Sequence, residues 1–171
     1  SSPDQNPHYV DPRPNLVVSL ARADVLLANG VELEIGWLPP LQVNARNAAI
    51  QTSGPGYFDA SHHVRLMEVP KKVDRSMGDI HPGGNPHYLF APRAAAKVAT
   101  ALAEHLARLT PANANDFRAN GRRFAGELLK LADEQSKRFQ ALGEEKLKVV
   151  TYHRSLVYLL DWLGIQRPIN V

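Results

Sequence analysis

The feature that most constrains the fold is an amphipathic run that restarts at Thr110-Pro111 and continues to Gly143. A helix of roughly 30 residues would be about 45 Å long, whereas the mean helix has about 11–12 residues. Gly121 and Gln135 fall on the seam that a coiled coil needs to be apolar, so the run predicts a rigid spine joining two lobes. The side chains that recur at steps of three and four residues are Phe117, Phe124, Leu128, Leu131, Gln135, Phe139 and Leu142.

Shorter segments on both sides of this run alternate between strand and helix patterns. We expect helices from Pro14, over 32–47 with an interruption at Pro39-Pro40, over 92–109 and over 155–163. We expect strands over 25–28, 64–69 and 147–153, another opening at 168–171, and loops over 50–63 and 70–92. Strands that alternate with helices predict an α/β architecture with parallel pairing.

Composition excludes several classes of protein. No run of 18 apolar residues exists, so we expect no membrane span, and the net charge of +3 comes from scattered basic residues, which argues against nucleic-acid binding. Cysteine is absent, which excludes thiolate metal sites and disulfide scaffolds, while seven histidines are present. The first residues lack the pattern of a signal peptide, as expected of a cytosolic, processed or trimmed chain. A bound metal would take nitrogen and oxygen ligands from His, Asp and Glu.

An internal repeat singles out two of the histidines. The sequence Asn6-Pro7-His8-Tyr9 recurs as Asn85-Pro86-His87-Tyr88, and each copy is followed by Pro-Arg and a predicted helix start. Proline stiffens the loop ahead of the histidine, and the tyrosine ring can anchor it by packing. Such rigid presentation suits a metal ligand, which must hold one rotamer.

His153 is the third candidate ligand, because it lies at the carboxyl end of a predicted strand, the edge at which open α/β sheets bind ligands. With His8 and His87 it could bind one divalent cation, and zinc would keep a fourth position for a carboxylate or water. Any of these histidines could instead be a hydrogen-bonding cap. The remaining histidines are expected at the surface: His62, His63, His81 and His105. His81 could instead be an auxiliary ligand, because it lies in the same loop as His87.

Other chemistry is sparse. No dinucleotide-binding, phosphate-loop, metalloprotease or nucleophile-elbow motif is present. One alternative is a zinc-dependent hydrolase with three histidine ligands, with Asp11 or Asp79 as its general base. Another is a structural interaction module built on the long helix.

The motifs together resemble the zinc- and manganese-type substrate-binding proteins of ABC importers. The resemblance is carried by four segments: 5–14, 23–30, 78–88 and 149–153. It implies a non-enzymatic receptor, periplasmic or extracellular, that binds Zn²⁺ or possibly Mn²⁺ and delivers it to a permease. It also implies that His8, His87 and His153 are the metal ligands.

The same resemblance implies two α/β lobes joined by a long backbone helix. Residues 1–110 would form the N-terminal metal-binding lobe without its first strand–helix unit, 111–143 the connecting helix and 144–171 the start of the C-terminal lobe. The second lobe, with its fourth ligand, would be incomplete. Unpaired strand edges would then favour a homo-oligomer or an exchange of elements between copies.

Overall fold

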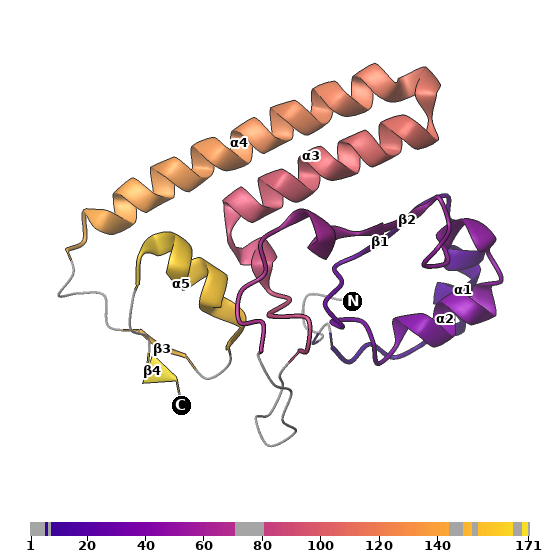
Figure 1. Ribbon diagram of the computed structural model, residues 1–171, viewed down its shortest axis with the longest axis horizontal. Coiled ribbons are helices and arrows are strands. Elements are labelled where there is room, and N and C mark those ends of the chain that lie inside the picture. The colour runs from indigo at the N-terminus through magenta and orange to yellow at the C-terminus, as the bar shows by residue number, and fades with distance from the viewer. Residues whose placement is uncertain are drawn as a thin grey trace. The chain divides into compact units, whose positions relative to one another are not determined.

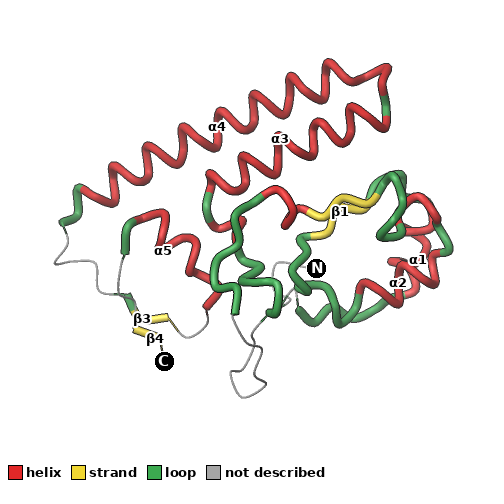
Figure 2. Tube along the Cα trace, viewed as in Figure 1, coloured by secondary structure: helices red, strands yellow, loops and turns green. Residues whose placement is uncertain are grey.

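The computed structural model describes residues 6, 8–70, 81–143, 149–151, 154–165 and 169–170. The chain divides into two compact units, Ser1–His62 and His63–Val171, and each is described by itself (Figures 1 and 2). Within the described ranges, no helix combines the length and the apolar character needed to cross a membrane.

The first unit is a small parallel sheet with two helices packed beside it. Its two strands pair in parallel, with Leu26 opposite Tyr57 and Ala28 opposite Asp59. Parallel neighbours need a crossover connection, and α2 lies in that connection. The elements in order are α1 (Pro14–Ala21), β1 (Leu26–Ala28), α2 (Leu38–Ala45), a 3₁₀ turn (Ala48–Ile50), β2 (Tyr57–Asp59) and a second 3₁₀ turn (Ala60–His63).

Proline and asparagine determine where the helices of this unit begin and end. Pro14 occupies the first turn of α1, where a backbone N–H is not needed. The side chain of Asn47 donates hydrogen bonds to the carbonyl oxygens of Leu20 (2.9 Å) and Ala23 (2.8 Å), and thereby ties the end of α1 to the turn after α2. The buried apolar side chains include Ala28, Leu38, Leu41, Ile50 and Phe58.

The second unit is dominated by two long helices joined by a tight turn. The elements in order are a 3₁₀ turn (Tyr88–Phe90), α3 (Pro92–Leu109), a 3₁₀ turn (Pro111–Asn113), α4 (Ala114–Gln140), β3 (Val150–Thr151), a 3₁₀ turn (Arg154–Leu156), α5 (Val157–Leu163) and β4 (Ile169–Asn170). The strands β3 and β4 also pair in parallel, with α5 between them in sequence. The fold is therefore α/β, as the alternation of patterns predicted.

Helices α3 and α4 lie side by side along most of the length of α3, and small residues allow the close approach (Figure 1). A Cβ built at Gly121 would lie 2.3 Å from the Cβ of Ala103, so the two helices touch at this glycine. Ala125 and Ala132 continue the buried face of α4. The pattern therefore predicted the long helix correctly, and Gly121 is a point of close contact with α3.

Charged side chains link the rims of the same two helices. Arg118 donates two hydrogen bonds of 2.7 Å to the Glu104 carboxylate, and they hold the pKa of Glu104 below its usual range. Arg93 forms an ion pair with Asp133. Exposed pairs of this kind contribute little stability compared with the packed alanine face.

Three local predictions are wrong. Residues 31–37 form turns instead of helix, because Gly30, Val31 and Glu32 all have positive φ, and α2 begins only at Leu38. The expected loop 50–63 contains β2. The expected strand 64–69 is absent from these described residues, because Met67 instead bonds to the loop at Asn85 and to α5.

Candidate metal centre

Asn6 and Asn85 each accept the same hydrogen bond from the histidine two residues later. Asn6 Oδ1 accepts a hydrogen bond of 3.0 Å from the backbone N–H of His8, and Asn85 Oδ1 accepts one of 2.9 Å from that of His87. An asparagine side chain that bonds the backbone two residues later forms an Asx turn. The sequence repeat is thus also a repeat of local structure, with a histidine held at the same position each time.

The first loop lies at the start of the first unit. The N–H of Tyr9 donates to the carbonyl oxygen of Asn6 (3.0 Å), which closes the turn a second time. The His8 side chain is partly buried, and its ring centre lies 6.3 Å from that of Tyr9, a residue that is itself 73% exposed. A Cβ at Gly36 would lie 3.4 Å from the carbonyl oxygen of His8, so the 31–37 turns support the loop.

The second loop is more deeply built into its unit. Asn85, Pro86 and Tyr88 are buried around the partly buried His87, which precedes the Tyr88–Phe90 turn. The ring centres of His87 and Phe90 lie 6.3 Å apart. The backbone of His87 therefore lies among buried neighbours, whereas that of His8 is held by its own turn and by the 31–37 turns.

The hydroxyl of Tyr158 on α5 joins this loop to the segment before it. It donates to the carbonyl oxygen of Asn85 (2.9 Å) and accepts from the N–H of Met67 (2.7 Å). Burial, assisted by the charge of Glu68, raises the pKa of Tyr158, although the bond from Met67 lowers it. The ring also meets Tyr88 edge-on, with ring centres 6.3 Å apart.

The predicted ligands are distributed over both units. His8 belongs to the first unit and His87 to the second, while His153 lies outside the described residues. Across the ranges that the structure describes, no three His, Asp or Glu side chains are grouped so that they could hold a metal ion. The three-histidine set therefore stays a prediction.

Two of the other histidines differ in their surroundings. The side chain of His62 is 77% exposed, and its Nε2 lies 3.8 Å from Asp59 Oδ2, as expected of a surface residue. His105 was expected at the surface, but on α3 it is partly buried. Burial, with the charges of Arg108 and His63, lowers the pKa of His105.

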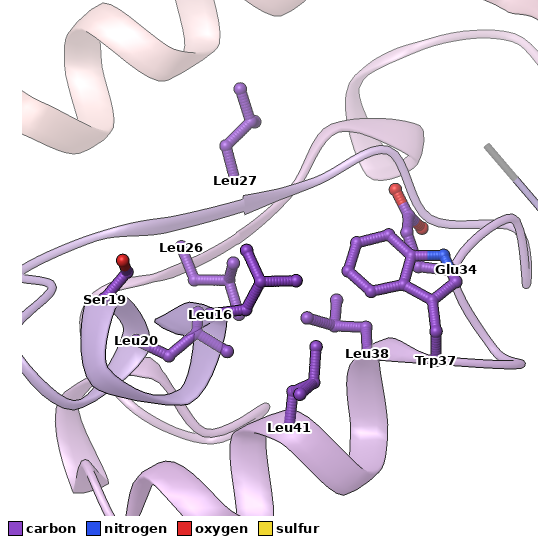
Figure 3. A pocket seen from close by; sticks show the side chains of 9 residues that line it. All are labelled: Leu16, Ser19, Leu20, Leu26, Leu27, Glu34, Trp37, Leu38 and Leu41. Atoms are coloured by element: carbon purple, nitrogen blue, oxygen red, sulfur yellow. The ribbon is translucent and has the colours of Figure 1, made fainter. Parts of the chain in front are cut away.

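A pocket of about 200 Å³ in the first unit was not predicted (Figure 3). Leucines from α1, β1 and α2 line it together with Trp37, and Figure 3 shows Leu26 and Leu27 on opposite sides of β1. Glu34 also lines the pocket, and its carboxylate accepts hydrogen bonds from the N–H groups of Asn29 (2.8 Å) and Gly30 (3.2 Å). A pocket so apolar is not a metal site.

Glu34 is expected to make the first unit less stable as pH rises. Burial, and to a lesser extent the charge of Asp59, raises the pKa of Glu34 despite the two backbone bonds. Folding therefore penalises the ionised form, and stability present at low pH is lost as pH rises through the raised pKa. As pH rises from the ordinary pKa of glutamate through the raised pKa of Glu34, the wild type should lose free energy of unfolding relative to Glu34→Gln.

Urea unfolding from about pH 4 to pH 8, followed by Trp37 emission in a Trp162→Phe background, measures the Glu34 effect. Both proteins carry the same background substitution, so only residue 34 differs. A wild-type profile that runs parallel to the Glu34→Gln profile would contradict the prediction.

Comparison with known proteins identifies a family whose model covers both loops. A family model described as zinc-uptake complex component A, periplasmic, matches residues 1–170. The manganese ABC transporter substrate-binding lipoprotein PsaA of Streptococcus mitis is 26% identical over 166 residues, which are 94% of this chain and 50% of PsaA. The iron ABC transporter substrate-binding lipoprotein MtsA of Streptococcus pyogenes serotype M1 is 26% identical over 164 residues, with the same coverage.

The fold is shared with a solved structure. A crystal structure of ZnuA superimposes with a TM-score of 0.76 at 23% identity, covering 98% of this chain and 57% of that one. The chain thus spans about half the length of the curated relatives it matches. These relatives are named for transport or zinc uptake, and nothing in the comparisons favours the hydrolase alternative.

Proposed function

Because the chain belongs to the family of zinc-uptake complex component A, we propose that it captures a divalent transition-metal ion outside the cytoplasmic membrane and delivers it to the permease of an ABC importer. The match over residues 1–170 carries this proposal, since it includes both loops in which asparagine holds a histidine amide. Capture and release leave the ion chemically unchanged, so the proposed protein is a receptor and not an enzyme.

His8, His87 and His153 are the proposed ligands, each supplying a neutral imidazole nitrogen. Two of them follow an Asx turn that restricts the backbone, which lowers the entropy lost when the ion binds. Imidazole suits zinc better than manganese, which prefers oxygen ligands, so zinc is the proposed ion. The relatives named for manganese and iron make Mn²⁺ the second ion to test.

The lobe assignment is proposed on the same basis. Residues 1–110 form the metal-binding lobe, 111–143 the connecting helix and 144–171 the start of the second lobe. The family is described as periplasmic, which agrees with capture in the cell envelope. Exchange of elements between two copies remains part of the proposal, because each sheet among the described residues has only two strands and so leaves an edge of each strand without a neighbouring strand there.

Calorimetric titration with Zn²⁺ at about pH 7.5 and about pH 5 tests the function, because protonated imidazole cannot bind a metal ion. We expect saturable binding at the higher pH and at least about tenfold weaker binding at the lower pH. Mg²⁺, which prefers oxygen ligands, is the matched control and should not bind. Equal zinc affinities at both pH values would remove the histidine site.

A further inference from the structure

The loop that carries His87 is pressed against residues 66–69 in the second unit. Gly84 has φ of +114°, and a Cβ there would lie 3.0 Å from the carbonyl oxygen of Met67. The next residue, Asn85, donates its backbone N–H to that same oxygen at 2.9 Å. The two segments therefore meet at backbone distance, and a side chain at position 84 would separate them.

The side chain of Asn85 makes three hydrogen bonds in three directions. Its Oδ1 accepts from the N–H of His87 (2.9 Å), while its Nδ2 donates to Glu68 Oε2 (2.9 Å) and to the carbonyl oxygen of Arg154 (2.9 Å). Asn85 is only 7% exposed, and both amide hydrogens and the oxygen are used in hydrogen bonds to the protein. A buried amide satisfied in this way fixes whatever it is bonded to.

Glu68 and Arg154 complete the arrangement. The second carboxylate oxygen of Glu68 forms an ion pair with the Arg154 guanidinium. Glu68 has φ of +53°, a left-handed conformation that side chains rarely adopt and that the surrounding bonds must maintain. The strained residue thus lies between the His87 loop and the segment that begins at Arg154.

We propose that Asn85 is a positioning residue for the metal site, because one buried amide fixes the backbone of His87 and ties it to Glu68 and to the carbonyl oxygen of Arg154. The inference rests on the proposed function, in which His87 is a ligand. Asn6, its counterpart in the first repeat, is exposed and forms the turn without this second set of bonds among the described residues.

Two Asn→Asp substitutions, one in the His87 loop and one on the exposed face of α4, form a matched pair. Asn85→Asp keeps the acceptor for the His87 amide but places a second oxygen against Glu68 and the Arg154 carbonyl, so zinc affinity should fall by about 10–100-fold. Asn120→Asp adds the same charge at an exposed position on α4 and keeps the acceptor for Arg123, so affinity should change by less than about threefold. Equal losses in the two variants would overturn the proposal.

A second substitution tests the direction of the hydrogen bond. Glu68→Gln in the Asn85→Asp background returns an amide donor to the pair, and it should recover at least about half of the lost affinity on a logarithmic scale. If Asn85→Asp does not fold, Asn85→Ser retains an acceptor without adding charge and should lower zinc affinity by about tenfold. Failure of the rescue, with both proteins folded, would count against the proposal.

Amide hydrogen exchange in the metal-free chain separates this inference from the proposed function. In Asn85→Asp, the amides of Met67 and Asp161 on α5 should exchange at least about tenfold faster, while those at the centre of α3 stay unchanged. A wild-type chain that does not bind zinc would overturn the proposed function. Amide exchange would then decide whether Asn85 holds the His87 loop to the segment around Met67 and to α5. Normal zinc binding by wild type and Asn85→Asp alike would overturn only the positioning role.

Discussion

His87→Ala should lower the zinc affinity of this chain by more than about 100-fold, beyond the roughly 10–100-fold typical of partners that merely orient a ligand. The imidazole is a proposed ligand, whereas the loop around it is fixed by the Asn85 side chain and by the Tyr158 hydroxyl. Removing the ring therefore deletes a ligand and leaves its support in place. Competition titration with a zinc chelator of known affinity measures the loss.

His62→Ala is the control for a surface histidine, because its side chain is 77% exposed. It should leave zinc affinity within about threefold of wild type, and circular dichroism should find all three proteins equally helical. Similar affinities for His87→Ala and wild type would remove His87 from the ligand set.

Gly121→Leu should destabilise the second unit by about 3 kcal/mol, since a well-packed contact cannot accept extra volume without displacing its elements. Even the first added carbon would lie 2.3 Å from the Cβ of Ala103. Helix α3 would have to move away from α4, and the buried alanine face would separate. Urea unfolding followed by helical circular dichroism measures the loss.

Gly126 offers a matched control on the same helix. A Cβ there meets nothing within 4 Å, so Gly126→Ala should raise the free energy of unfolding by about 0.5–1 kcal/mol through helix propensity alone. If Gly121→Leu and Gly126→Ala shift the free energy of unfolding in the same direction, the close contact at Gly121 does not stabilise the packing of α3 against α4 as predicted.

Helices with clear start signals could be predicted from the sequence. The helix expected over 92–109 has exactly those bounds, because Pro92 occupies its first turn and Leu109 precedes another proline-led turn. The long run was also confirmed as α4, although the first three residues after Thr110 form a 3₁₀ turn. Local side-chain chemistry determines these boundaries, so a local pattern is sufficient to locate them.

Segments whose conformation depends on distant partners could not be predicted. The alternating pattern over 64–69 resembles a strand, yet the backbone of Met67 bonds to Tyr158, 91 residues away in sequence. Strand β2 has only three residues and follows a glycine-rich turn, so its pattern is too short to be distinguished from loop. Periodicity carries no information about such long-range pairings.

The candidate site likewise combines local features, which the sequence can predict, with long-range bonds, which it cannot. The repeat correctly indicated that His8 and His87 are presented in the same way. An Asx turn is formed within three residues, so a short motif is sufficient to encode it. The bonds from Asn85 to Glu68 and Arg154 join residues 17 and 69 positions apart, which no local motif announces. The predicted third ligand, His153, lies outside the described residues.

The unequal anchoring of the two loops determines how far a small movement at each histidine travels. A displacement of the His8 backbone acts first on its own turn and on the 31–37 turns packed against its carbonyl oxygen. A displacement at His87 is expected to reach α5, because the carbonyl oxygen of Asn85 accepts a hydrogen bond directly from the Tyr158 hydroxyl on that helix. We therefore expect movement at His8 to affect mainly the neighbouring turns, and movement at His87 to be transmitted to a helix.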